Sequence, residues 1–326
     1  MKIIHAYTLL NKIGGAQKVL MDVKHYLGGK VYSFNDYHEL DHSYKIKKDE
    51  YKKLKLYDVF FIKNAVIISH HRKLTTLFVL SNKLFKCRNR IIHVAHNEFY
   101  SLKWLTFLPN EIIAVSKAVK KNLCQFFNIS PERVEVILNG LSDKNVFKEE
   151  RVLPKEIRII YPARISPVKQ QMEVAQFFSS LNLKNISIFF AGTGPEEHEL
   201  SNFCQRHKNI HFLGQLTQIE NSLIEYDFLL LFSKNEGLPL SLIEALRAGL
   251  PAICNNVGGN SEVIDSSTGF VVSNWNELGV LLKQLDKGTD KNYALKIRNC
   301  RSKFLSLFSK QVMQRKYYTK LTSKQL

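Results

Sequence analysis

The chain has 326 residues, of which 45% are apolar and 23% are charged, and its formal net charge is +18. This length is too great for one small core and suits two α/β domains of ordinary size. No apolar run approaches the roughly 18 residues that a membrane-spanning helix needs. Five scattered cysteines without a Cys-x-x-Cys pair support neither a disulfide framework nor a zinc site. Because the N-terminus enters a strand pattern without a long apolar leader, we expect a cytoplasmic protein.

The excess of positive charge is denser in residues 1–150 and favours polyanionic partners, such as nucleic acid, anionic lipid headgroups or phosphorylated substrates. Basic residues are most closely spaced in the segment 83–90, Lys-Leu-Phe-Lys-Cys-Arg-Asn-Arg, where apolar residues separate them. A surface that docks on anionic lipid has this composition. A solvated basic face has it too, and the sequence leaves both interpretations open.

Short apolar segments alternate with amphipathic ones along the first half of the chain, which is typical of parallel strands joined by crossover helices. A helix is predicted after Gly14-Gly15, through residues 17–26, and another through 122–127 with Ser116 as its N-cap. The predicted strands of this half are residues 2–6, 58–62, 90–95, 111–115 and 134–138.

A polar, charged stretch, 141–155, is predicted to be a linker, after which the pattern restarts. The predicted strands of the second half are 158–161, 186–191, 210–213, 228–232 and 252–255. The predicted helices are 170–181, 196–206, 221–226, 240–248, a helical region 276–307, and 310–321. The fold class is therefore α/β, with two Rossmann-like domains in tandem. Ligands of such open sheets bind at the carboxyl ends of the strands, so we expect a cleft between two facing domains.

The most informative segment is 233–251, Ser-Lys-Asn-Glu-Gly-Leu-Pro-Leu-Ser-Leu-Ile-Glu-Ala-Leu-Arg-Ala-Gly-Leu-Pro, which follows an apolar strand. Gly237 allows a close backbone approach to a ligand, and Pro239 suits the first turn of a helix. The N–H groups around Leu240 and Ser241 then form a site for a diphosphate. Glu236 and Glu244, spaced on either side of this helix start, could each bind a pair of vicinal hydroxyls.

This segment resembles the Glu-x7-Glu motif of family-4 retaining glycosyltransferases, which have the GT-B fold of two facing Rossmann-like domains. The resemblance implies that Glu236 contacts the hydroxyls of the donor sugar and that Glu244 holds the ribose, with Gly237, Leu238, Pro239, Leu240 and Ser241 around the donor. The segments 257–264 and 268–271 resemble the next stretch of the family.

Further family landmarks occur in order along the second half. Residues 161–169, Tyr-Pro-Ala-Arg-Ile-Ser-Pro-Val-Lys, resemble the family's Gly-Arg-Leu…Lys segment, which implies that Arg164 and Lys169 neutralise the donor diphosphate. Ala163 stands where the family usually has Gly. Residues 191–195 resemble the Gly-x-Gly-Pro loop, with Gly194 beside the nucleotide, and Leu213 matches the strand end near which the base is read.

The first half carries the family's remaining landmarks. Gly14-Gly15 resembles the loop whose N–H groups face the donor, although Gln17 replaces the family's Glu. His96 matches the active-site histidine at a strand end. Residues 114–117 and 137–140 resemble the Val-Ser and Pro-Asn-Gly segments, and 308–318 resembles the final helix. Taken alone, Gly14-Gly15 is equally typical of a tight turn, and a strand-end histidine is often structural.

The resemblance implies three parts: an acceptor-binding domain over 1–150, a nucleotide-sugar-binding domain over 151–307, and a helix over 308–326 that crosses back onto the first domain. His96, Arg164, Lys169 and Glu236 would be the catalytic residues. The donor would be a nucleotide sugar, most commonly a UDP-hexose or UDP-N-acetylhexosamine. The acceptor would be a saccharide, preferably lipid-linked, at the inner face of the cytoplasmic membrane, in cell-surface polysaccharide or lipopolysaccharide biosynthesis.

No cofactor besides the donor is expected, and because the chain has no Asp-x-Asp pair we expect no metal. Two other functions compete with transfer. A nucleotide-sugar epimerase on the same fold would convert the donor without an acceptor. A nucleic-acid-binding protein is suggested by charge alone, but the sequence has no recognisable nucleic-acid motif or cluster of stacking aromatic residues, so we expect no nucleic-acid partner.

Overall fold

The computed structural model describes residues 2–11, 14–288 and 290–323. The chain forms two compact units: unit 1 comprises residues 1–140 and 310–326, and unit 2 comprises 141–309. The division lies ten residues before the boundary expected from the sequence. The segment after residue 140 belongs to unit 2 because Lys148 and Arg151 both contact the buried carboxylate of Asp227, at 3.3 and 2.5 Å.

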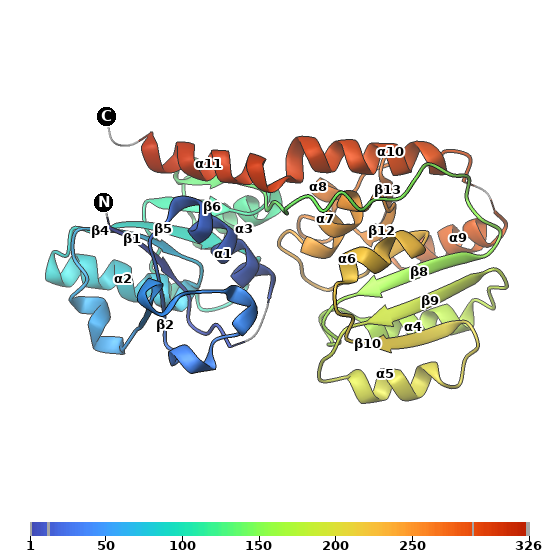
Figure 1. Cartoon of the computed structure of the whole chain (residues 1–326), viewed down its shortest axis with the longest axis horizontal. Helices are drawn as coiled ribbons and strands as arrows, with labels where there is room; N and C mark the ends of the chain where they lie inside the picture. Colours follow the sequence, from blue (N-terminus) through green and yellow to red (C-terminus); the bar gives the residue numbers. More distant parts are fainter. Residues whose placement is uncertain (1, 12–13, 289, 324–326) are drawn as a thin grey trace. The chain divides into compact units, whose positions relative to one another are not determined.

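Unit 1 contains a seven-stranded sheet in the order β3-β2-β1-β4-β5-β6-β7, and all of its strand pairs are parallel (Figure 1). The strands are β1 (Lys2–Ala6), β2 (Lys30–Ser33), β3 (Tyr51–Lys53), β4 (Ala65–Ser69), β5 (Arg90–Ala95), β6 (Glu111–Ala114) and β7 (Val134–Val136). The sequence did not lead us to expect β2, β3 or β4.

The helices of unit 1 are α1 (Gly15–Leu27), α2 (Arg72–Phe85), α3 (Lys117–Phe127) and α11 (Lys310–Thr322), with 3-10 turns η1 (Tyr37–Glu39), η2 (His42–Tyr44), η3 (Lys48–Glu50), η4 (Leu56–Phe60), η5 (Lys103–Leu105) and η6 (Pro131–Arg133). Ser116 caps α3 as predicted, since its hydroxyl accepts from the Val119 N–H at 3.1 Å. Helix α11 contacts α1, and Lys310 forms an ion pair with Asp22 at 2.5 Å.

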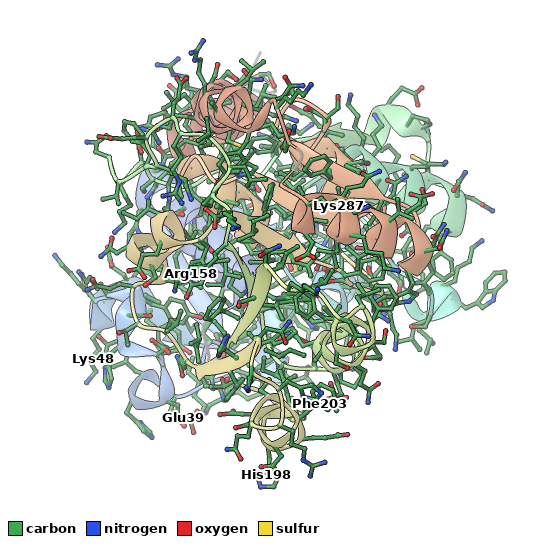
Figure 2. The ribbon with its side chains drawn as sticks, turned by 90° about the vertical axis from the view of Figure 1, so that its right-hand side faces the viewer. Glu39, Lys48, Arg158, His198, Phe203 and Lys287 are labelled. Atoms are coloured by element: carbon green, nitrogen blue, oxygen red, sulfur yellow. The ribbon has the colours of Figure 1, made fainter. Side chains whose placement is uncertain are left out.

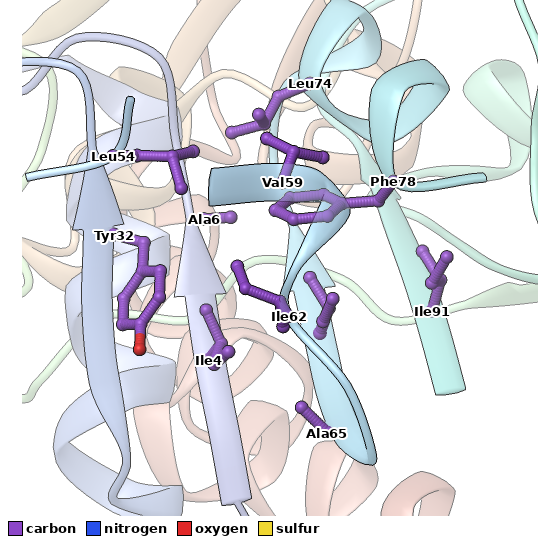
Figure 3. Close-up of a cluster of buried hydrophobic side chains, with 11 residues drawn as sticks. Ile4, Ala6, Tyr32, Leu54, Val59, Ile62, Ala65, Leu74, Phe78 and Ile91 are labelled. Carbon is purple, nitrogen blue, oxygen red and sulfur yellow. The ribbon is translucent and has the colours of Figure 1, made fainter. Parts of the chain in front are cut away.

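The predicted strand at 58–62 is wrong. Residues Leu56–Phe60 form the 3-10 turn η4, in which the Asp58 carboxylate accepts from the Lys55 N–H at 2.9 Å. The apolar side chains of Val59 and Ile62 still enter the core, where they pack with Ile4, Leu74 and Phe78 (Figure 3). The strand is the next apolar run, β4, whose five residues are all buried.

Unit 2 contains a six-stranded parallel sheet in the order β10-β9-β8-β11-β12-β13. Its strands are β8 (Ile157–Pro162), β9 (Ile186–Ala191), β10 (Ile210–Gly214), β11 (Phe228–Leu231), β12 (Ala252–Asn255) and β13 (Gly269–Val272). Its helices are α4 (Gln171–Ser180), α5 (Glu197–Cys204), α6 (Ile219–Ser222), α7 (Leu240–Arg247), α8 (Asn260–Val263), α9 (Trp275–Asp286) and α10 (Tyr293–Lys303), with η7 (Leu223–Glu225) and the π-helical η8 (Phe304–Phe308). Arg158 of β8 is labelled in Figure 2. Its guanidinium lies over the Phe189 and Tyr226 rings, 5.0 and 4.9 Å from their centroids.

Both sheets reverse their strand order at one place. In unit 1 the reversal falls between β1 and β4, and in unit 2 between β8 and β11. In open α/β sheets the crevice beyond the carboxyl ends of these two strands is where ligands bind. Each unit therefore has its own expected site, built from the loops that follow those two strands.

Candidate active site

An ion pair joins the two loops at the switch point of unit 2. Lys169, on the loop after β8, pairs through its ammonium with the carboxylate of Glu236, on the loop after β11. The Glu236 side chain is only 7% exposed and that of Lys169 is 24% exposed. A buried carboxylate is costly unless a cation or hydrogen bonds compensate it, and the Lys169 ammonium is such a partner for Glu236. The structure thus brings together two of the four predicted catalytic residues.

A buried tyrosine that the sequence did not single out holds the Lys169 loop. The Tyr161 hydroxyl, at the end of β8, donates to the Lys169 carbonyl and accepts from the Phe232 N–H at 3.0 Å. A second link runs from the Lys234 N–H to the Val168 carbonyl, at 2.8 Å. These bonds fasten the loop after β8 to the loop after β11, and the Lys169 backbone is therefore fixed beside Glu236.

The loop after β12 fixes the backbone of Glu236. Gly258 has a φ of +55° and lies so close that a Cβ atom there would be 1.9 Å from the Glu236 carbonyl oxygen. Next to it, the Gly259 N–H donates to the Gly237 carbonyl at 3.0 Å. Only glycine fits this close approach of two backbones. The segment 257–264 therefore packs against the backbone of Glu236 and Gly237 and holds it in place.

The predicted Gly194 lies in an equally close contact. A Cβ atom on Gly194 would be 1.9 Å from the Ile165 carbonyl oxygen, and one on Gly192 would be 2.0 Å from that of Ala163. The Ile165 N–H donates to the Thr193 carbonyl at 2.9 Å. Ala163 is not among the described residues with positive φ, so alanine is compatible with this turn. Gly194 thus orders the loop that carries Arg164 and Lys169.

Helix α7 begins at the site with its first N–H groups uncapped by a side chain. Pro239 occupies the N-cap position, with φ −71° and ψ 125°, rather than the first helical turn that we predicted. The first N–H groups, including those of Leu240 and Ser241, have no acceptor within the helix, and no side chain caps them. Such a helix start attracts anions through its N–H groups and dipole. Glu244 lies one turn further along α7 and is half-buried.

Other predicted donor residues of unit 2 differ in their exposure. The Arg164 side chain is exposed, while its carbonyl accepts from the Gln171 Nε2 at 3.0 Å. The Leu238 side chain is buried, so only its backbone can face a ligand. Leu213 lines a cavity of about 380 Å³ with Phe189 and His211, and none of Lys169, Glu236 and Glu244 lines it. Leu213 and these three charged residues therefore do not line this cavity together.

Three buried polar atoms near Glu236 have no hydrogen-bond partner among the described residues. They are the Ser233 Oγ, the Asn235 Oδ1 and the Asn260 Oδ1. Asn260 is fully buried, and its amide nitrogen donates to the Asn255 carbonyl at 3.0 Å. Buried polar atoms are rarely left unpaired. All three lie in segments that the sequence singled out, 233–251 and 257–264, but none of them was predicted to be a site residue.

The predicted residues of unit 1 gather at the switch point of that unit. His96, just after β5, lines a cavity of about 200 Å³ together with Tyr7, Ala16 and His70. The His96 Nε2 lies 2.9 Å from the His70 Nδ1, and the two rings are stacked. His96 is therefore part of a histidine cluster at the carboxyl edge of the sheet rather than an isolated strand-end histidine.

Gly14 and Gly15 begin helix α1 next to this cavity, since Ala16 is one of the residues that line it. Gly14 is the N-cap, with extended φ and ψ, and Gly15 is the first helical residue. The Gln17 side chain folds back over Gly14, its Oε1 2.5 Å from where a Cβ atom would lie. Gln17, which replaces the family's Glu, therefore covers the start of α1.

Burial keeps these histidines uncharged. Desolvation lowers the pKa of His96 to about 4, that of His93 to about 3, and that of His70 well below its usual value. Among the described residues, no group of three or more His, Cys, Asp or Glu side chains is arranged to hold a metal ion. At neutral pH the cluster is thus a set of neutral hydrogen-bonding groups.

The two units together have the GT-B fold. HepE from Anabaena, solved in complex with UDP, matches 99% of this chain with a TM-score of 0.83 and 17% identity, and the match covers the whole of that protein. The lipopolysaccharide outer core galactosyltransferase WaaB matches 99% of the chain and the whole of that protein with a TM-score of 0.79 and 16% identity. At these identities the likeness shows the fold alone.

The family follows from the sequence matches. The model of glycosyl transferases group 1 matches residues 142–291, and that of Glycosyltransferase Family 4 matches residues 44–145. The chain belongs to the glycosyltransferase family that these two models describe.

Curated relatives share about a quarter of the matched residues. The Escherichia coli O-antigen biosynthesis glycosyltransferase WbnH is 26% identical over 56% of this chain and 52% of that protein. The UDP-Gal:alpha-D-GlcNAc-diphosphoundecaprenol alpha-1,3-galactosyltransferase of Escherichia coli is 26% identical over 64% of this chain and 59% of that protein. The chain spans between half and three-fifths of the length of these relatives.

Proposed function

We propose that this chain is a retaining glycosyltransferase that moves a hexose or N-acetylhexosamine from a UDP-sugar to a saccharide acceptor in cell-surface polysaccharide biosynthesis. The observation that carries the proposal is the Lys169–Glu236 pair at the switch point of unit 2, beside the uncapped start of α7. Relatives that act in O-antigen synthesis and a structural neighbour with bound UDP support the same reaction class and donor.

In this proposal the charges of unit 2 act on the leaving group. Breaking the sugar–phosphate bond places negative charge on the diphosphate of UDP. Lys169, Arg164 and the first N–H groups of α7 supply the positive charge that stabilises it. Glu236 binds hydroxyls of the transferred sugar, and Glu244 binds the ribose hydroxyls. Lys169 then contacts both Glu236, which binds the sugar, and the diphosphate, which is part of the leaving group.

The proposed transfer uses no metal and no protein nucleophile, and the acceptor attacks from the face that the diphosphate leaves. His96 orients the transferred sugar. Gly14 and Gly15 face the donor through the start of α1, Gly194 orders the diphosphate loop, and Leu213 contacts the base. The acceptor is assigned to unit 1.

We also propose that the acceptor is lipid-linked and that the chain works on the inner face of the cytoplasmic membrane. None of the helices in the described part of the chain is long and apolar enough to span a bilayer. In the basic segment, Lys83, Lys86 and Arg88 are exposed beside Leu84 and Phe85, as a lipid-docking surface requires.

The last arginine of that segment has a different role. Arg90 forms a bidentate ion pair with Glu111, with both distances 2.9 Å, and donates to the Leu321 carbonyl at 2.8 Å. It is therefore excluded from the proposed lipid contact. Sedimentation with liposomes that does not depend on anionic lipid would remove the membrane part of the proposal.

Transfer itself is tested by incubating the chain with UDP-glucose, UDP-galactose or UDP-N-acetylglucosamine, with and without a polyprenyl-diphosphate-linked saccharide. We expect UDP release and an α-linked product, read by NMR of the anomeric proton, only when the acceptor is present. An isomerised UDP-sugar in the absence of acceptor would instead identify an epimerase. A β-linked product would contradict retention.

A further inference from the structure

The cavity at the switch point of unit 1 has a definite chemical character. Its volume is about 200 Å³, and it lies beyond the ends of β1, β4 and β5, which contribute Tyr7, His70, His93 and His96. Helix α2 begins at its wall with His71, Arg72 and Lys73. Among the described residues that line the cavity there is no carboxylate, so its only fixed side-chain charges are the two cations.

The start of α2 adds further positive potential. His71 is the N-cap and makes no side-chain capping bond, so the N–H groups of Arg72, Lys73 and Leu74 have no acceptor within the helix. The first turn holds no acidic residue, although helix starts favour acids because of the helix dipole. Two cations placed at the positive end of a helix are unfavourable unless an anion joins them.

Two buried histidine atoms provide a second observation that points to a ligand. The Nε2 atoms of His70 and His93 have no hydrogen-bond partner among the described residues, and both side chains line the cavity. Their residues are only 4% and 1% exposed. The opposite nitrogen of each ring is occupied, His70 Nδ1 by His96 at 2.9 Å and His93 Nδ1 by Thr75 Oγ1 at 2.8 Å. A bound group can supply the missing partners.

We infer that this cavity binds a phosphate or diphosphate group of the acceptor, at the start of α2 between Arg72, Lys73 and the histidine cluster. This inference rests on the proposed function, since it names the class of acceptor. Several groups converge there: two cationic side chains, the N–H groups of a helix start, and two imidazole Nε2 atoms that lack a partner among the described residues. Such a set exceeds what the two oxygens of a carboxylate can use and matches the oxygens of a phosphate.

The phosphate can come from a lipid-linked or a soluble acceptor. Arg72 donates to the Ser101 carbonyl at 2.7 Å and lies over the Phe99 ring, so the loop that follows β5 borders the site. That loop exposes Trp104 and Leu105, which are 88% and 71% exposed. Apolar side chains beside a phosphate site suit a lipid-linked phosphate, and the experiment below compares the two sources.

The direct test titrates the full chain with inorganic pyrophosphate in the presence of excess UDP, which occupies the donor site. The readout is the imidazole Cε1–H NMR signals of His70, His93 and His96, which report on unit 1. We expect pyrophosphate to shift these signals. We expect Arg72→Gln and Lys73→Gln each to weaken pyrophosphate binding about tenfold, since each removes a charge-assisted contact. The control Lys121→Gln, an exposed residue of α3, should bind as the wild type does.

Histidine signals that pyrophosphate leaves unchanged in the wild type would overturn the inference. So would a pyrophosphate affinity in the Arg72→Gln and Lys73→Gln variants that equals that of the wild type. Equal binding of a dicarboxylate such as malate would overturn the phosphate assignment.

In transfer assays, the acceptor KM should rise in both variants while the donor KM stays constant. A rise in KM for both a soluble saccharide phosphate and its lipid-linked form would show that the phosphate alone is recognised. A rise for the lipid-linked form only would show that the lipid is also required. A wild-type chain that fails to bind UDP would refute the proposed function without affecting the histidine readout.

Discussion

The Lys169 ammonium pairs with the Glu236 carboxylate across 67 residues of sequence, and this pair ties together the two loops that follow β8 and β11. Tyr161 and Gly258 each hold one partner in place: Tyr161 donates to the Lys169 carbonyl, and Gly258 lies against the Glu236 backbone. Because the carboxylate is almost wholly buried, the pair is needed for stability as well as for the proposed chemistry.

Breaking this pair should affect stability and activity in different ways. Lys169→Met is expected to lower the free energy of unfolding by about 1–3 kcal/mol, because it leaves a buried carboxylate without its cation. It should also lower kcat by about 10²–10³, the usual effect of removing a group that stabilises transition-state charge. Denaturant unfolding and steady-state transfer assays measure the two effects.

The double variant separates the two roles. Lys169→Met combined with Glu236→Gln should regain most of the lost stability, since no buried charge is left unpaired, but should stay inactive. Lys234→Met is the matched control, because Lys234 and its partner Glu173 are 56% and 39% exposed. We expect it to change the free energy of unfolding by less than about 0.5 kcal/mol. A double variant as active as the wild type would contradict the role of the pair.

Gly258→Ala should disturb the site through the backbone of Glu236. The added Cβ atom would lie 1.9 Å from the Glu236 carbonyl oxygen, and φ is +55°, so both a clash and left-handed strain arise. We expect a loss of more than about 2 kcal/mol in the free energy of unfolding, together with weaker donor binding. Gly288→Ala, with φ +75° and no atom within 4 Å of the new Cβ, isolates the strain and should cost about 1 kcal/mol. Equal losses in the two variants would show that the contact with Glu236 is unimportant.

Stability should fall steeply in mild acid because of the buried histidines. The pKa of His5 is lowered to about 4 and that of His93 to about 3, chiefly by desolvation. The unfolded chain therefore takes up protons as the pH falls through about 6.5, while the folded chain does not until about pH 4. Each such histidine should reduce the free energy of unfolding by about 1.4 kcal/mol per pH unit in this window.

A variant isolates one of these titrations. His5→Gln, which removes a histidine whose Nε2 lies 2.9 Å from the Gly28 carbonyl oxygen, should reduce the slope by about one proton. The matched control is His198→Gln, an exposed residue of α5 (Figure 2), and His5→Gln should have the shallower slope of the two variants. Urea unfolding between pH 4.5 and pH 7.5 measures the slope. A stability that is constant across this range would contradict the burial of neutral histidines.

Chelation should not affect the proposed reaction, because Lys169, Arg164 and the start of α7 supply the positive charge on the diphosphate. We expect the rate of transfer to be the same with and without EDTA. Loss of activity in EDTA that manganese restores would show that a metal ion carries that charge instead.

Much of the fold could be predicted because apolar segments alternate regularly with amphipathic ones. The prediction failed where that signal is ambiguous. The run at 58–62 is as apolar as a strand, but the preceding Lys55–Asp58 turn makes it a 3-10 segment, and the adjacent β4 is the buried strand. The strands β2 and β3 lie near the sheet edge and are short and partly polar, so no apolar run marks them.

The candidate site was only partly readable from the sequence. Glu236, Glu244 and Lys169 were predicted from segments that resemble those of the family, and the structure pairs Lys169 with Glu236. Tyr161 and Gly258 act through backbone atoms of residues far away in the sequence, so no local pattern identifies their roles. The histidine cluster was also missed beyond His96, because His70 and His96 follow different strands and meet only through the parallel pairing of β4 with β5.

The most direct test of the central claim is calorimetric titration of UDP and UDP-sugars into the wild type, Glu244→Ala and the control Glu199→Ala, an exposed residue of α5. We predict that the wild type and the control bind alike, and that Glu244→Ala binds about ten- to a hundredfold more weakly, since it loses charge-assisted hydrogen bonds to the ribose. Wild-type affinity in Glu244→Ala, or no binding of UDP to the wild type, would contradict the assignment of unit 2 as the donor site.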